Sequence, residues 1–120
     1  MNEKIMVVDD DKDIREVIQV LLSSEGYEVI EASNGKEALE LVDDDTDLII
    51  LDVMMPEMNG YQACVLLREK TKAPILFLTA KGQDRDKTLG FSSGGDDYLT
   101  KPFSYNELNG RVKAFLRRYH

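Results

Sequence analysis

Three short apolar runs, at residues 5–8, 48–51 and 75–78, constrain the fold of this chain more than any other feature. Each run is nearly unbroken, which is typical of strands buried on both faces, and such strands belong to parallel sheets. Residues 27–31 and 97–100 are weaker strand candidates. We therefore expect five strands, three of them in the interior of the sheet.

Helical patterns fill the intervals between these runs. Residues 14–22 place apolar side chains at three-four spacing, and similar faces follow Asn34, Asn59 and Ser104. Residues 83–93 contain few large apolar side chains, so a helix there would be poorly anchored. Alternating strands and helices predict an α/β fold, with a five-stranded parallel sheet and helices on both faces. The leading topology is flavodoxin-like (βα)5, with strand order 2-1-3-4-5.

Length and charge restrict the classes of function. The 120 residues suit one domain, spanning 1–120. Fifteen Lys and Arg against 23 Asp and Glu give a net charge of −8, which argues against direct binding of nucleic acid. A single cysteine excludes an internal disulfide, and no apolar run approaches the length of a membrane span. We expect a cytoplasmic domain with no membrane partner.

Polar residues follow each predicted strand at the point where it ends. Asp9 and Asp10 follow the first run, Asp52 the second and Thr79 the third, while Lys101 follows the last candidate strand. Ligands of open α/β sheets gather at the carboxyl ends of the strands. These side chains are therefore expected to converge although they are far apart in sequence.

The chemistry of this set suggests phosphoryl transfer. Close carboxylates repel each other, and Mg²⁺ accepts oxygen ligands of this kind together with a phosphate oxygen. A carboxylate can also attack a phosphoryl group to form an aspartyl-phosphate, whose transition state metal, lysine and hydroxyl would stabilise. Asp52 is the best nucleophile because it stands alone at the end of the central strand, and Asp10 would share the metal.

Other interpretations of the acidic residues fit less well. Asp11 and Asp13 are better explained as helix-capping residues than as ligands. The aspartates after the first run imitate half of a calcium loop, but its sixth and twelfth positions would be Ile14 and Val20. A dehalogenase-type phosphatase would have a second acid where this chain has Met54.

Four blocks together resemble the receiver domain of bacterial two-component response regulators. They are VVDDD at 7–11, LDVMMPEMNG at 51–60, LTA at 78–80 and DDYLTKPF at 96–103. The resemblance covers the whole chain and implies that Asp52 is the phosphoacceptor for a sensor histidine kinase. It also implies Mg²⁺ ligation by Asp10, Asp52 and the backbone carbonyl of Met54, with Asp9 assisting through water.

The same resemblance assigns roles to residues around the phosphoacceptor. Lys101 would contact the phosphoryl oxygens, and the Lys101–Pro102 bond is usually cis in this family. Thr79 would move to bond the phosphoryl group, and Tyr98 would swing inward behind it. Residues 83–93 fall where the family has its switch helix.

The closing blocks are most similar to the OmpR/PhoB subfamily, whose receivers precede a winged-helix DNA-binding domain. Such receivers dimerise through the fourth helix, fifth strand and fifth helix. The matching charged pairs are Lys87 with Glu107, Asp96 with Arg111, and Asp97 with Arg118. Gly95 departs from the alanine that is usual in the subfamily. DNA would then be bound only through an output domain absent from this chain.

The function expected from these features is a phosphorylatable switch without conventional substrate turnover. Phosphorylation at Asp52 would drive homodimer formation and control transcription through the output domain. Two alternatives stay open at this point. One is a stand-alone receiver that acts by binding a protein partner, and the other is a Mg²⁺-dependent phosphatase that uses Asp52 transiently.

Overall fold

In the computed structural model, which describes residues 2–80, 92 and 94–119, five parallel strands form one sheet in the order β2-β1-β3-β4-β5. The strands are β1 (Lys4–Val8), β2 (Glu28–Ala32), β3 (Thr46–Asp52), β4 (Ile75–Ala80) and β5 (Asp97–Lys101). Both the order and the parallel pairing confirm the flavodoxin-like prediction.

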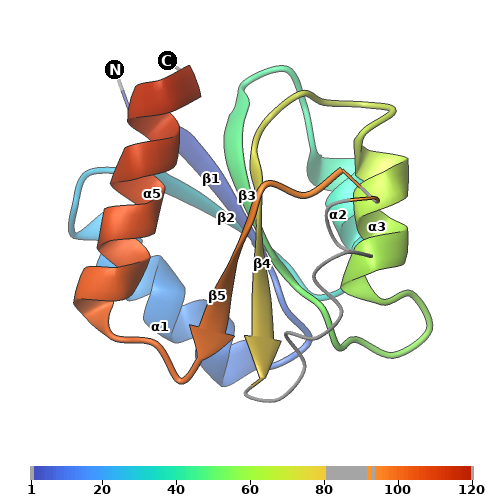
Figure 1. Cartoon of the computed structure of the whole chain (residues 1–120), viewed down its shortest axis with the longest axis horizontal. Coiled ribbons are helices and arrows are strands. Elements are labelled where there is room, and N and C mark those ends of the chain that lie inside the picture. Colours follow the sequence, from blue (N-terminus) through green and yellow to red (C-terminus); the bar gives the residue numbers. More distant parts are fainter. Residues whose placement is uncertain (1, 81–91, 93, 120) are drawn as a thin grey trace.

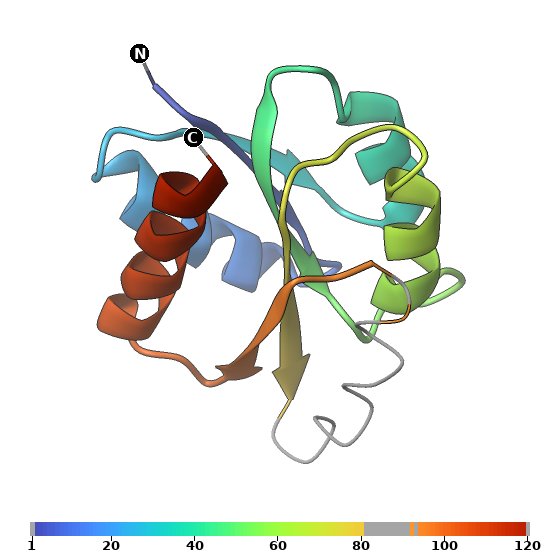
Figure 2. The ribbon, with the colours of Figure 1, turned by 45° about the horizontal axis from the view of Figure 1, so that its top comes forward.

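Helices cover both faces of the sheet (Figure 1). Helices α1 (Lys12–Ser23) and α5 (Tyr105–Tyr119) lie on one face, and α2 (Gly35–Leu41) and α3 (Gly60–Leu67) lie on the other. Figure 2 shows the same layers from a second direction. The helix expected within 83–93 falls largely outside the described residues. Among the helices in the described part of the chain, none is long and apolar enough to cross a membrane.

The central strands divide their side chains between two buried clusters. Successive side chains of a strand point to opposite faces, so alternate residues of one run enter different clusters. The cluster beneath α2 and α3 takes Met6, Val8, Ile49, Leu51 and Phe77 from the three central strands. The cluster beneath α1 and α5 takes Ile5, Val7, Ile50, Leu76 and Leu78. Burial on both faces explains why these runs are apolar without interruption.

Side-chain caps fix the points where the helices begin. Asp11 caps α1 by accepting a hydrogen bond from a backbone N–H of its first turn. Asn59 and Gln62 form a reciprocal capping box at the start of α3, and Ser104 and Glu107 do the same before α5. All three caps lie in loops that leave the carboxyl ends of strands. The capping role expected for Asp11 is confirmed, whereas Asp13 is the second residue of α1 and donates its N–H to Asp11.

Candidate functional site

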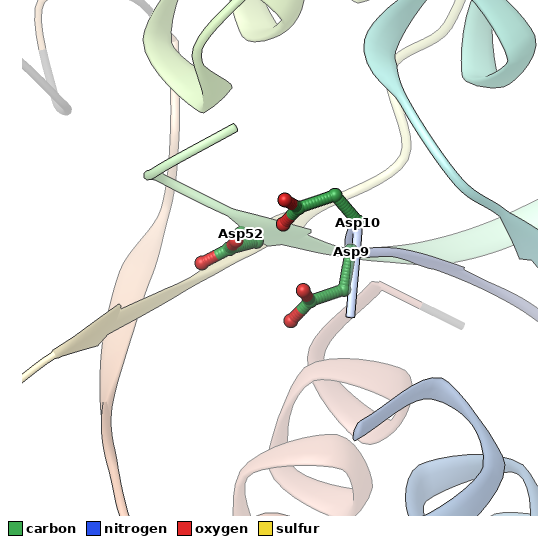
Figure 3. Close-up of side chains that lie close together, drawn as sticks. All are labelled: Asp9, Asp10 and Asp52. Carbon is green, nitrogen blue, oxygen red and sulfur yellow. The ribbon is translucent and has the colours of Figure 1, made fainter. Parts of the chain in front are cut away.

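Three carboxylates meet where β1 and β3 end. Asp9 and Asp10 follow β1, Asp52 is the last residue of β3, and one oxygen from each lies within 4.8 Å of the others. Figure 3 shows the three side chains directed into the same space. The carboxylates that the sequence placed at one sheet edge therefore do converge, and their geometry suits a metal ion.

Strand periodicity explains why Lys101 joins this group. Asp9, Asp52 and Lys101 each lie two positions beyond a residue of the cluster beneath α1 and α5, and those residues are Val7, Ile50 and Leu99. Side chains two residues apart in a strand share a face, so all three point the same way. The Lys101 Nζ lies 3.0 Å from Asp9 Oδ2 and 3.2 Å from Asp52 Oδ1. The Lys101–Pro102 peptide bond is cis, as the resemblance implied.

Burial and crowding shape the ionisation of Asp52. Its side chain is only 6% exposed and that of Asp9 is fully buried. Burial, together with the negative charge of Asp9, raises the pKa of Asp52 to about 6, although Lys101 opposes the shift. Burial works to lower the pKa of Lys101, but its bonds to Asp9 and the charge of Asp52 raise it overall. The site therefore holds three carboxylates and the ammonium of Lys101. When all of them are ionised, negative charge exceeds positive charge.

The start of α3 is pressed against the end of β3. A Cβ atom at Gly60 would lie 2.3 Å from the backbone oxygen of Asp52, so only glycine fits there. The Gly60 N–H instead donates to the carbonyl of Val53 at 2.8 Å. This contact fixes both ends of the loop that contains Met54. The Met54 side chain is exposed, and ligation through its carbonyl stays a prediction.

Thr79 and Tyr98 lie on the opposite face of the sheet from Lys101. Thr79 is two residues beyond Phe77, and Tyr98 is paired in register with Phe77. The Thr79 hydroxyl is buried, with no hydrogen-bond partner among the residues that the structure describes. The Tyr98 ring is already buried, and its hydroxyl lies 3.1 Å from that of Tyr61. An unsatisfied buried hydroxyl is rare and is available to a ligand.

Gly95 has a steric explanation. A Cβ atom at this position would lie 2.0 Å from Cε2 of Phe77. The Phe77 ring is fully buried, and its centroid lies 5.1 Å from that of Tyr61 and 5.2 Å from that of Tyr98. The absence of a side chain at Gly95 thus makes room for this aromatic group.

The charged residues assigned to a dimer face make contacts within the single chain. Arg111 Nη1 lies 2.7 Å from Asp97 Oδ2 and also donates to the carbonyl of Tyr98. Glu107 serves in the cap of α5, and Arg118 lies over the ring of Phe115. Lys87 lies outside the described residues. The pairings between subunits remain predictions.

Asp96 belongs to a contact that the sequence did not reveal. Its carboxylate accepts hydrogen bonds from Arg68 Nη2 and from the backbone N–H of Ile75, both at 2.8 Å. Arg68 also donates to the carbonyls of Ala73 and Gly94 at 2.6 and 2.8 Å. The guanidinium thus ties the end of α3 to the segment before β5. Asp96 has a role within the chain whether or not it also meets a second subunit.

Arg15 is a second contact missed at the sequence level. Its Nη1 donates to the backbone oxygen of Asp9 at 2.7 Å, and its Nε lies 3.2 Å from Oε1 of Glu31. Arg15 is the fourth residue of α1, so its long side chain reaches back to the strand end that precedes the helix. Helical side chains lean toward the N-terminus, which brings Arg15 near this strand end, but nothing in the sequence marks the carbonyl that it binds.

Comparisons with known proteins agree with this geometry. The sequence matches the response regulator receiver domain over residues 5–113. It is 52% identical over 120 residues to the alkaline phosphatase synthesis transcriptional regulatory protein PhoP of Bacillus subtilis, covering 98% of this chain and 50% of PhoP. It is 47% identical over 117 residues to the transcriptional regulatory protein CpxR of Escherichia coli, with 98% and 50% coverage. The chain thus spans half the length of these relatives.

A solved structure shows the same fold. The receiver domain of the Francisella response regulator 1452 superposes with a TM-score of 0.89 at 39% sequence identity, covering 99% of this chain and 100% of that one. PhoP and CpxR are transcriptional regulators of the OmpR/PhoB type. The chain therefore belongs to the response regulator receiver domain family.

Proposed function

We propose that Asp52 accepts a phosphoryl group from the phosphohistidine of a sensor histidine kinase. An oxygen of the Asp52 carboxylate attacks phosphorus, the P–N bond to the donor imidazole breaks, and the bonding electron pair leaves with that imidazole. The observation that supports this most is a strand-end carboxylate held 3.2 Å from a lysine ammonium, with two further carboxylates beside it. Such a carboxylate is a nucleophile placed among groups that stabilise phosphoryl transfer.

The donor set fits Mg²⁺. Asp9, Asp10 and Asp52 offer only oxygen, which is the ligand that Mg²⁺ prefers, and they carry more negative charge than Lys101 balances. In this proposal Asp10 and Asp52 would hold the ion directly with the carbonyl of Met54, and Asp9 would assist through water. When bound, the ion would supply positive charge for the phosphoryl oxygens.

The protein's own side chains supply the rest of the site. Lys101 already contacts Asp52, so its ammonium is placed to bond an oxygen of a phosphoryl group carried there. The buried hydroxyl of Thr79 would donate to another phosphoryl oxygen. Tyr98 shares a sheet face with Thr79, which supports a role for both in transmitting the phosphorylated state.

The ionisation of Asp52 supports a metal requirement. Only the carboxylate attacks phosphorus, and a pKa of about 6 leaves part of this group protonated in mildly acidic solution. A cation beside Asp52 would favour its charged form and so keep the nucleophile active.

The output of the switch is proposed to be transcription. PhoP and CpxR are transcriptional regulators, and residues 1–120 correspond to half of their length. The net charge of −8 argues that DNA is bound by another part of the protein. Phosphorylation would favour a homodimer in the cytoplasm, where a kinase and DNA are accessible. Its face would be made by the expected charged pairs: Lys87 with Glu107, Asp96 with Arg111, and Asp97 with Arg118.

Phosphorylation by acetyl phosphate tests the assignment of Asp52. With Mg²⁺ present, intact-protein mass spectrometry should show one added phosphoryl group on the wild type and none on Asp52→Asn. Asp43→Asn is the matched control, because Asp43 also pairs with a lysine but lies in the loop before β3. Continued labelling of Asp52→Asn would refute the assignment. Repeated rounds of phosphate release from many substrates would instead favour a phosphatase.

A further inference from the structure

Arg15 joins the acidic site to the neighbouring strand. Its guanidinium donates to the backbone oxygen of Asp9 at 2.7 Å and pairs with Glu31 of β2 at 3.2 Å. The Arg15 side chain is only 14% exposed and its bond to Asp9 is partly buried, whereas Glu31 is 36% exposed at the other contact. A planar guanidinium can serve two acceptors at once in a fixed geometry, which a lysine ammonium on a flexible stem does poorly.

The contact with Asp9 bears on Asp10. The carbonyl of Asp9 and the backbone nitrogen and Cα of Asp10 lie in one rigid peptide plane. The Asp9 N–H bonds the carbonyl of Ala32 at 3.2 Å, and Oδ1 of Asp9 accepts from the N–H of Asp11 at 2.9 Å. With its carbonyl held by Arg15, the peptide between Asp9 and Asp10 has a fixed orientation. The direction in which the exposed Asp10 side chain leaves the backbone is thereby set.

We propose that Arg15 is a positioning residue for the metal site, acting through the Asp9–Asp10 peptide to hold Asp10 within reach of a cation shared with Asp52. This rests on the proposed function, since it assumes that the three carboxylates bind Mg²⁺. Arg15 needs no contact with the metal or with the phosphoryl group. Its role is to keep one ligand in place before the ion arrives.

The charge and the hydrogen bonds of Arg15 act on Mg²⁺ affinity with opposite signs. A positive guanidinium near the site repels a cation, so loss of charge alone would tighten binding. Loss of the bond to the Asp9 carbonyl would free Asp10 to move and would weaken binding. The direction of change in a neutral variant therefore separates the two effects without any measurement of phosphorylation.

Isothermal titration with MgCl₂, without a phosphoryl donor, provides the test on the whole chain. Arg15→Gln and Arg15→Lys are each expected to weaken Mg²⁺ binding by about 10-fold. This is the lower end of the range of about 10- to 100-fold that is typical when a residue that orients a metal ligand is lost. Lys12→Gln is the matched control, because Lys12 is another cation of α1 whose side chain is 76% exposed. It should leave the affinity unchanged or slightly tighter.

The outcomes separate this inference from the proposed function. Unchanged or tighter Mg²⁺ binding by Arg15→Gln overturns the positioning role. The positioning role is also overturned if the variants bind Mg²⁺ with wild-type affinity but unfold at a lower temperature without the metal. That result would show that the contact of Arg15 is purely structural. If Arg15→Gln does not fold, the Mg²⁺ affinity of Arg15→Lys tests the positioning role, because this variant preserves the positive charge. Absence of Mg²⁺ binding in the wild type would overturn the metal site itself and this inference with it. Normal Mg²⁺ binding without phosphorylation of Asp52 would count only against the proposed function.

Discussion

Two lysine–aspartate pairs lie at opposite ends of the sheet. The pKa of the aspartate is lowered in one pair and raised in the other. Lys4, at the start of β1, lies 2.6 Å from Asp43, and Lys101, at the end of β5, lies 3.2 Å from Asp52. The Asp43 side chain is 48% exposed, and the hydrogen bond from Lys4 lowers its pKa. The Asp52 side chain is 6% exposed, and burial raises its pKa to about 6.

The difference shows that a lysine partner does not by itself determine the charge of an aspartate. Water solvates Asp43, so the attraction of Lys4 is sufficient to lower the pKa. At the other end Asp52 loses that solvation and shares Lys101 with Asp9, which is itself fully buried. The same two residue types thus make an ordinary surface contact at one end and a site deficient in positive charge at the other.

Replacing each lysine in turn should give the largest difference between the two pairs, measured as the rate of phosphorylation of Asp52. Lys101→Met is expected to slow phosphorylation of Asp52 by acetyl phosphate about 100-fold, because the variant lacks a donor for the phosphoryl oxygens. The Lys4→Met variant should be phosphorylated at the wild-type rate. Initial rates measured by mass spectrometry at saturating Mg²⁺ would check both. Equal rates for the two variants would show that Lys101 has no part in transfer.

Mg²⁺ should stabilise the folded protein only by binding at the end of the sheet that holds the buried Asp52. At 100 times its dissociation constant, Mg²⁺ is expected to raise the free energy of unfolding by about 2.7 kcal/mol. Asp52→Asn should lose most of this increase, and Asp43→Asn should retain it. Urea denaturation with and without Mg²⁺ gives the measurement. An equal response of both variants would place the ion elsewhere.

The pH dependence of stability should differ in sign between the two aspartates. The pKa of Asp52 is raised from 3.8 to about 6 in the folded protein, so without Mg²⁺ its contribution to stability falls as the pH rises through that window. The pKa of Asp43 is lowered, so its contribution is lost as the pH falls below 3.8.

Denaturant unfolding between pH 3 and pH 8 in the absence of divalent ions would measure both effects. Asp52→Asn should flatten the decline between about pH 4 and pH 6. Asp43→Asn should alter only the acidic end of the profile. A decline that persists in Asp52→Asn would mean that another group produces it.

A buried pair without charge provides the smallest expected effect and a reference for the other two. Tyr61→Phe removes one of two buried hydroxyls that lie 3.1 Å apart. The expected loss is about 1 kcal/mol in the free energy of unfolding, and it should be the same at pH 4 and pH 8 because the deleted hydrogen bond involves no carboxylate or amine. A strongly pH-dependent loss would show that a charged group contributes to this buried contact.

The sequence predicted best those features that depend on burial and periodicity. The three central strands were found because both faces of each are covered, and Asp9, Asp52 and Lys101 converge because parallel strands end at one edge. Strand limits were less accurate. β2 begins at Glu28, one residue later than expected, because the N–H of Tyr27 still bonds to Leu22 of α1.

Contacts made by long side chains to backbone carbonyls could not be predicted. Arg15 reaches Asp9, and Arg68 reaches Ala73 and Gly94, but no repeat or spacing marks the carbonyl that a flexible arginine will choose. The position of Tyr98 was also beyond the sequence. The structure shows the ring buried, and its inward movement on phosphorylation stays a prediction.

The contact between Gly95 and Phe77 limits the order in which substitutions can be accepted. A methyl group at position 95 would overlap the ring of Phe77, so the alanine usual in the subfamily cannot be introduced while that ring is present. A smaller residue at 77 would have to come first or at the same time. Chimeras that bring an alanine to position 95 should therefore also replace Phe77, because the new methyl group would otherwise overlap its ring.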